Sequence, residues 1–287
     1  MGVIGLLTDY GLKDAYVARV KAKIARLSPD SKVIDISHDV QKFHLPEAAY
    51  LLANVWRDFP KGSVFLIGVD HPYELCKYVL CEVEGKYFIA SDSGLLSLLF
   101  DQDRMTPLKF DRVCSLDVQE EHPFELYNSL VEVALDIVNS GAVDDSLECI
   151  EDVKRFTQDG IKIVSDKIFG KVLYVDSYGN IITNIHRDIV EVNSLGRSFE
   201  VKAGSEYIPR LSRGYKVGYE AKCVAFYNVD GYLEISITDA NASQLLGVKN
   251  EVGLIFGNNQ VKASEKLGIQ YDSVVTIIFT SQQQSLL

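Results

Sequence analysis

Two short segments of this chain place a carboxylate where an apolar run ends. They are Leu6–Gly11, which contains Asp9, and Val175–Asn184, which contains Asp176. In both, an aromatic residue and a glycine follow the Asp closely. A carboxylate at such a strand end either caps a turn or holds a hydroxyl or an amine of a ligand. One segment lies in each half of the chain, so the pattern suggests a ligand that is gripped between two domains.

Asp9 follows an expected strand, Val3–Thr8. The carboxyl end of an early strand is where open α/β sheets bind ligands. One carboxylate can accept hydrogen bonds from both hydroxyls of a ribose and so orient a nucleoside. The side chain is equally explained as the N-cap of a helix in the segment that follows.

Asp70 ends another expected strand, Ser63–Val69. Lys77 and His122 are candidates to assist it, because a carboxylate, a cation and an imidazole can together hold and activate a water molecule. Each also has an ordinary explanation. Asp70 could be a turn residue, Lys77 a solvated charge and His122 a helix cap before Pro123.

Other chemistries have no motif behind them. His38 and His44 invite a metal interpretation, but their spacing is not that of a metal-binding helix, and a turn or core role for His38 is favoured. The sequence contains no dinucleotide-binding glycine motif, no P-loop and no serine-hydrolase elbow. We therefore expect no metal site.

Composition limits the partners. The 287 residues carry 40 acidic against 29 basic side chains, a formal net charge of −11, and no basic block that could follow a phosphate backbone. We expect no nucleic-acid partner. The five cysteines form no C-x-x-C pair, which favours a reduced intracellular setting. Neither a signal peptide nor an apolar run of roughly 18–20 residues is evident, so the sequence predicts a cytoplasmic protein without membrane contact.

The first half of the chain predicts a mostly parallel sheet with helices on both sides, because strands and helices alternate. The expected strands are 3–8, 32–37, 63–69 and a hairpin over 78–90, and the expected helices are 16–27, 46–56, 95–100 and 123–138.

The second half has short β-branched segments, which predict an all-β barrel or sandwich. These segments are 171–176, 181–185, 198–203, 221–227, 231–237, 252–256 and 273–279. The polar stretch Glu148–Asp166 is the expected linker. The prediction is therefore an α/β domain over 1–160 and a β-barrel domain over 161–287.

Five segments, in this order, resemble the S-adenosylmethionine hydroxide adenosyltransferases, relatives of the bacterial fluorinase and chlorinase. The segments are Leu6–Tyr16, Val33–His38, Ser91–Ser97, Val175–Asn184 and Gly231–Ile235. No single segment is decisive, but their order and number make the resemblance specific.

The resemblance implies an N-terminal α/β domain joined to a C-terminal β-barrel. It also implies a homotrimer, with substrate held between the N-terminal domain of one subunit and the C-terminal domain of the next. By the family motifs, Asp9 would hold the ribose diol, and Phe43 would lie beside the sugar.

The same motifs assign residues in the second half. Asp176 and Asn180 would hold the amino-acid end of the substrate. Tyr178 and Tyr215 would flank the adenine, although ordinary barrel packing explains both tyrosines as well.

The implied reaction is attack of water on the 5′ carbon of the ribose, which gives adenosine and methionine without a cofactor. The family uses an Asp-Arg-His set, and Asp70 and His122 match its Asp and His. Lys77 stands where the Arg is expected. Lysine keeps the charge but lacks the planar fork of arginine, so the geometry around Asp70 is expected to differ.

Two alternatives remain. A protein that binds adenosyl compounds with little or no catalysis would keep Asp9 and Asp176 and lose chemistry at Lys77. A halogenase is disfavoured, because Asp70 would place negative charge beside an incoming halide. Pro123 also lacks the backbone N–H that the halide enzymes offer at that position.

Overall fold

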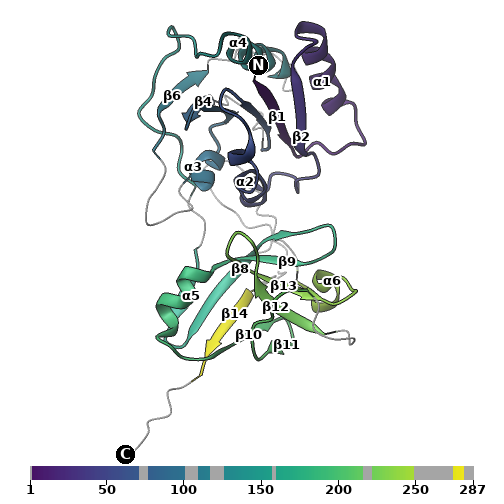
Figure 1. Cartoon of the computed structure of the whole chain (residues 1–287), viewed down its shortest axis with the longest axis vertical. Coiled ribbons are helices and arrows are strands. Elements are labelled where there is room, and N and C mark those ends of the chain that lie inside the picture. Colours follow the sequence, from purple (N-terminus) through teal and green to yellow (C-terminus); the bar gives the residue numbers. More distant parts are fainter. Residues whose placement is uncertain are drawn as a thin grey trace, which may run out of the picture. The chain divides into compact units, whose positions relative to one another are not determined.

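The computed structural model describes residues 2–70, 77–100, 109–116, 126–156, 160–215, 222–248 and 274–280. The chain divides into two compact units, Met1–Thr157 and Gln158–Leu287 (Figure 1). Whether the two halves fold as separate domains, as predicted for 1–160 and 161–287, stays a prediction. No helix in the described ranges is long and apolar enough to cross a bilayer.

The N-terminal unit is built on a sheet with the strand order β2-β1-β3-β5-β4-β6 among the described residues. The strands are β1 (Val3–Thr8), β2 (Lys32–Ser37), β3 (Val64–Gly68), β4 (Tyr78–Val83), β5 (Lys86–Ser91) and β6 (Arg112–Leu116). The first four in spatial order run parallel, while β4 pairs antiparallel with both β5 and β6. The carboxyl ends of β1, β2, β3 and β5 therefore lie along one edge of the sheet.

Helices cover both faces of this sheet (Figure 1). One face is covered by two helices, α1 (Tyr16–Leu27) and α4 (Leu126–Ser140), which pack over a first core. The other face is covered by α2 (Leu45–Ala53), α3 (Leu95–Phe100) and the short 3-10 helix Trp56–Asp58, which pack over a second core. In α1 the buried residues are Val17, Val20 and Ile24, which is the helical spacing that the sequence showed. The burial of β1 along its whole length is typical of a strand that is covered on both faces.

The C-terminal unit is a nearly closed antiparallel sheet with the order β11-β10-β14-β8-β9-β13-β12, and β7 pairs with β8. The strands are β7 (Lys162–Val164), β8 (Lys167–Val175), β9 (Ile181–His186), β10 (Phe199–Ala203), β11 (Glu206–Ile208), β12 (Cys223–Tyr227), β13 (Tyr232–Ile237) and β14 (Val274–Phe279). Near the open seam, the Ser212 N–H donates to the Ala225 carbonyl of β12 at 2.7 Å. The described helices of this unit are α5 (Arg187–Ser194) and α6 (Ala242–Leu246). The predicted fold class is confirmed.

The predicted linker Glu148–Asp166 is wrong over its first part. Val153 is buried in the second core of the N-terminal unit, and Phe156 packs against that core. Cys149 forms a β-bridge with Cys114 of β6. These long-range contacts anchor a stretch whose composition alone is polar. The expected strand at 252–256 lies outside the described residues.

Candidate functional site

Asp9 and Asp70 meet at the carboxyl edge of the parallel strands, just after β1 and β3. The Asp9 side chain is buried, with 5% exposed. Its Oδ2 accepts a hydrogen bond from the Phe43 N–H at 2.9 Å and one from the Asp70 N–H at 3.4 Å. At the end of β5, the Ser91 hydroxyl donates to the Asp70 carbonyl at 3.1 Å. One carboxylate thus ties together the ends of β1 and β3 and the loop after β2.

Both backbone donors to Asp9 are in the left-handed conformation. Phe43 has φ of 63° and Asp70 has φ of 52°. Each such conformation costs about 1–3 kcal/mol in a residue other than glycine and tends to occur at functional sites. Hydrogen bonds to an ionised acceptor are stronger than neutral ones, so the Asp9 carboxylate offsets part of this cost.

The ionisation of Asp9 and Asp70 is opposed by burial, and the charge of Asp9 opposes that of Asp70 further. Burial raises the pKa of Asp9, against the lowering effect of the Phe43 and Asp70 N–H groups and of the Lys42 charge. The Lys42 ammonium donates to the Asp9 carbonyl. Burial and the nearby Asp9 charge raise the pKa of Asp70, while Lys154 lowers it. A cationic ligand placed here would favour the ionised form of both groups.

Two alternative roles from the sequence are now decided. Asp9 is not a helix N-cap, because α1 begins after Ala15 and no side chain caps it.

His38 has a core role: it is buried and its Nδ1 lies 2.9 Å from the Thr8 hydroxyl. His44 is the N-cap of α2, where its Nδ1 accepts from the Glu47 N–H at 3.3 Å. Among the residues that the structure describes, no cluster of His, Cys, Asp or Glu could hold a metal ion.

Among the residues that the structure describes, Lys154 is the cation that lowers the pKa of Asp70. The sequence analysis placed this residue in the linker. The backbone of its segment is fixed by a hydrogen bond of 2.7 Å from the Lys154 N–H to the Asp92 carboxylate. Lys77 is exposed, and its carbonyl accepts from the Asp92 N–H at 2.8 Å. His122 lies outside the described residues, so the trio with Asp70 stays a prediction. No motif marks Lys154, which is why sequence reasoning missed it.

In the C-terminal unit, Asp176 organises its own loop between β8 and β9. Its Oδ1 accepts from the Tyr178 N–H at 2.9 Å and from the Asn180 N–H at 2.8 Å, and its Oδ2 accepts from the Asn180 side-chain amide at 2.8 Å. Asn180 is buried, whereas Asp176 is half-buried and can still accept from a ligand. Tyr178 projects from the loop with 79% of its surface exposed. The predicted pair Asp176 and Asn180 is therefore in direct contact.

Glu234 of β13 is a further charged residue of this region. Its side chain is 3% exposed, and its Oε1 has no hydrogen-bond partner in the described part of the chain. Burial raises its pKa, as does the Asp176 charge, whereas hydrogen bonds from Tyr215 and Asn228 lower it. The predicted residue Tyr215 thus contacts Glu234, and its ring lies edge-on to Phe226 at 4.7 Å. A Glu within the apolar run of β13 was the signal that the sequence analysis left unused.

Fold and site together define a two-unit protein with acidic groups for ligand binding in each unit. An α/β unit carries two carboxylates, Asp9 and Asp70, at neighbouring strand ends, and a barrel-like unit carries an acidic loop around Asp176. Carboxylates with backbone-ordered oxygens suit a ligand that has hydroxyl groups and positive charge.

Comparison with known proteins identifies the family. Residues 4–146 match the SAM hydroxide adenosyltransferase N-terminal domain, and residues 170–255 match the SAM hydroxide adenosyltransferase C-terminal domain. The chain belongs to the SAM hydroxide adenosyltransferase family, which is a family of enzymes.

Curated relatives agree over nearly their full length. The chain is 28% identical over 273 residues to the (R)-S-adenosyl-L-methionine hydrolase of Methanocaldococcus jannaschii, covering 89% of this chain and 97% of that protein. It is 24% identical over 285 residues to a fluorinase of Nocardia brasiliensis, covering 86% and 94%. A crystal structure of an uncharacterised conserved protein from Thermotoga maritima has the same fold, with a TM-score of 0.77, 23% identity and coverage of 96% of this chain and 100% of that chain.

Proposed function

We propose that this protein hydrolyses S-adenosylmethionine to adenosine and methionine, by attack of water on the 5′ carbon of the ribose. The observation that supports the proposal is the pair Asp9 and Asp70 at the carboxyl edge of the sheet, where the Asp9 carboxylate accepts a hydrogen bond of 3.4 Å from the Asp70 backbone N–H. We assign Asp9 to the sugar and Asp70 to the base. Relatives that are named (R)-S-adenosyl-L-methionine hydrolases support it.

In the proposed reaction, Asp9 accepts hydrogen bonds from the ribose hydroxyls and fixes the sugar. Ionised Asp70 holds the water and accepts its proton as the oxygen bonds to the 5′ carbon. The bond from this carbon to sulfur breaks, and sulfur keeps the electron pair as neutral methionine forms. A sulfonium is already a good leaving group, so we propose that no cofactor takes part. Positioning and in-line approach supply the remaining acceleration.

The rest of the substrate is assigned to the other predicted residues. Asp176 and Asn180 are proposed for the amino-acid end, because their mutual hydrogen bonds fix the orientation of one polar cluster. Tyr178 and Tyr215 are proposed to flank the adenine. Phe43, with 43% of its surface exposed, offers a ring to the sugar next to Asp9.

The test is product analysis with purified protein and each sulfonium epimer of S-adenosylmethionine. Adenosine and methionine should appear in equal amounts. In water labelled with a heavy isotope of oxygen, the label should enter the 5′ hydroxyl of adenosine. Asp70→Asn should abolish turnover and leave binding, measured by calorimetry, largely in place. Intact ligand that binds without products would instead establish a non-catalytic adenosyl-binding protein. Normal turnover by Asp70→Asn would remove Asp70 from the mechanism.

Matched variants of Lys77 and Lys154 test which of these two lysines supports the ionised form of Asp70. Lys154→Met should lower the rate, because the positive charge of Lys154 favours the ionised form of Asp70. Lys77→Arg should preserve or raise the rate, since it restores the fork that the family uses. If Lys77→Met is inactive while Lys154→Met is normal, Lys77 alone supplies the charge, as the sequence predicted.

Halide chemistry is the weaker alternative. Asp70 would repel a halide, so no halogenated adenosine is expected when fluoride or chloride is added to the assay. The homotrimer remains a proposal that rests on the family resemblance, and the cytoplasmic setting remains a proposal that rests on the cysteine usage. Light scattering of the purified protein tests the trimer directly.

A further inference from the structure

Two cysteines of the N-terminal unit face each other across a β-bridge. Cys114 lies in β6, and Cys149 lies in the stretch that follows α4. Cys114 is fully buried, whereas Cys149 is exposed. Among the four cysteines that the structure describes, only Cys149 is classed as exposed; Cys81 is buried and Cys223 is half-buried.

The hydrogen bonds around the bridge define its type. The Ser115 N–H donates to the Glu148 carbonyl at 2.9 Å, and the Ile150 N–H donates to the Val113 carbonyl at 3.0 Å. The bonds flank the cysteine pair, so Cys114 and Cys149 form a non-hydrogen-bonded antiparallel pair. The Cα atoms of such a pair are about 4.5 Å apart, and the side chains point to the same face. That spacing falls within the range of about 4.4–6.8 Å that disulfides require.

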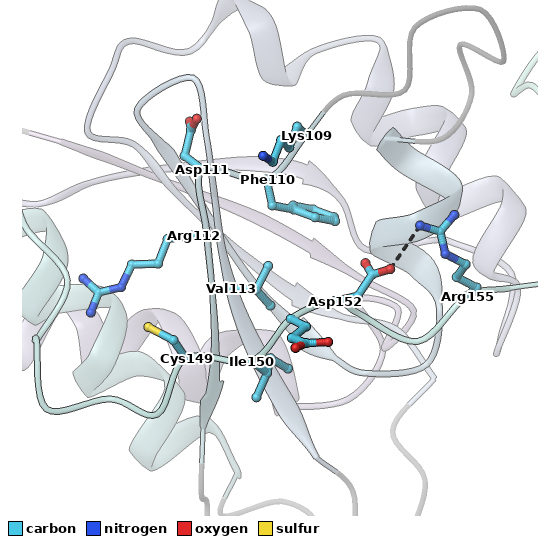
Figure 2. A pocket seen from close by; sticks show the side chains of 10 residues that line it. Lys109, Phe110, Asp111, Arg112, Val113, Cys149, Ile150, Asp152 and Arg155 are labelled. Carbon is cyan, nitrogen blue, oxygen red and sulfur yellow. Dashed lines mark hydrogen bonds and ion pairs between the residues drawn. The ribbon is translucent and has the colours of Figure 1, made fainter.

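The outer sulfur can be reached from outside, and the Cys149 thiol donates to the Leu147 carbonyl at 4.0 Å. Burial, and then the neighbouring Cys149 thiol, raises the pKa of the inner thiol, Cys114. Cys149 lines a cavity of about 530 Å³ with Arg112, Val113 and Ile150. Figure 2 shows the Cys149 sulfur on the Arg112 side of this cavity. A small oxidant can therefore reach the outer sulfur, whereas the inner sulfur is buried.

We propose that Cys149 is a thiol modification site for low-molecular-weight disulfides and that Cys114 is its resolving partner. The Cys149 thiolate attacks one sulfur of the small disulfide, which forms a mixed disulfide and releases one thiolate. The Cys114 thiolate then attacks the Cys149 sulfur, forms the Cys114–Cys149 bond and releases the second thiolate. Two protein thiols are oxidised and one small disulfide is reduced to two thiols.

The bond would fasten the stretch after α4 to the edge of the sheet. This stretch continues to Phe156, whose N–H donates to the Ser97 hydroxyl at 2.9 Å, so its two ends would be held by a covalent and a hydrogen bond. The inference is independent of the proposed reaction, because it needs only the register of the bridge and the access to Cys149.

The test treats the reduced full-length protein with glutathione disulfide and maps its peptides by mass spectrometry without reduction. The wild-type protein should yield a Cys114–Cys149 linked peptide. Cys114→Ser should retain glutathione on Cys149, because no resolving thiol is present. Cys149→Ser should show neither the cross-link nor glutathione on buried Cys114. Circular dichroism establishes that each variant is folded.

Cys76 lies outside the described residues, so the wild-type experiment is repeated with Cys76→Ser, and Cys223→Ser serves as a matched control. The linked peptide should form in both. The proposal is overturned if wild-type protein stays unmodified, keeps glutathione on Cys149 without cross-linking, or links Cys149 to another cysteine. The wild-type map alone decides this, even if a variant fails to fold.

Discussion

Replacing Asp9 tests the central feature of the site, the carboxylate that holds two strained residues. Asp9→Ala removes the acceptor of the Phe43 and Asp70 N–H groups. Asp9→Asn keeps an acceptor oxygen of the same reach and removes only the charge. The pair therefore separates the structural role of the oxygen from the role of the charge in binding.

The expected magnitudes follow from these contacts. A buried donor left without its acceptor costs about 1–3 kcal/mol, so the two donors should destabilise Asp9→Ala by about 2–4 kcal/mol after some relaxation. Asn should stay within about 1 kcal/mol of wild type, because weaker neutral hydrogen bonds are offset by the removal of a buried charge. Burial raises the pKa of Asp9, which shows that its ionised form is disfavoured in the folded protein.

The assay is urea unfolding at neutral pH, followed by the fluorescence of Trp56. This is the one Trp of the chain, and it is buried in the same unit. Binding of S-adenosylmethionine is measured by calorimetry on the same samples. Asp9→Asn should fold normally and lose about 10- to 100-fold in affinity, since hydrogen bonds to a charged group contribute about 1.5–3 kcal/mol. An Ala variant as stable as wild type, or an Asn variant as unstable as Ala, would refute this account of Phe43 and Asp70.

Three further predictions concern Asp70, Glu234 and Gly179. The Asp9 charge raises the pKa of Asp70, so in Asp9→Asn the Asp70 pKa falls and the acid limb of the rate profile should move to lower pH; an unmoved or upward-shifted limb contradicts the coupling. Burial raises the pKa of Glu234 above the ordinary value of 4.5 for a glutamate, so the folded state is favoured as pH falls toward that value. Glu234→Gln should therefore be more stable than the wild type at neutral pH. That gain should shrink in acidic urea titrations; a constant difference would locate the effect elsewhere. Gly179→Ala should destabilise the C-terminal unit by about 2–3 kcal/mol in thermal unfolding, because φ is +84° and a Cβ would clash with the Asn241 side chain that caps α6; an unchanged midpoint would contradict this.

The sequence predicted elements whose signal is local. α1 matched its predicted bounds, Tyr16–Leu27, because its apolar residues repeat at helical spacing and Ser28-Pro29 ends it. The hairpin of β4 and β5 was expected around Gly85, which has φ of +73°. In contrast, β6 and the stretch 148–156 were missed. Their strand character comes from pairing with distant segments, and neither carries a long apolar run.

The candidate site divides in the same way. That Asp9 and Asp70 meet could be expected, because both follow parallel strands that end at one edge of a sheet. The left-handed conformation of Phe43 and the effect of Lys154 on Asp70 could not be expected. The first depends on an acceptor 34 residues away, and the second on a segment that composition marks as a linker.

Folding alone gives no reason for both residue 9 and residue 70 to carry a carboxylate. Each carboxylate is disfavoured by burial, and the charge of Asp9 further disfavours ionisation of Asp70. A polar pair that only closed the loop after β2 could do so with an amide in place of Asp9. The arrangement would become favourable with the substrate that we propose, because the positive charge of its sulfonium would stabilise both ionised forms. The same event would ionise Asp70 when a base is needed, so binding of the cation and activation of the water would be one electrostatic step.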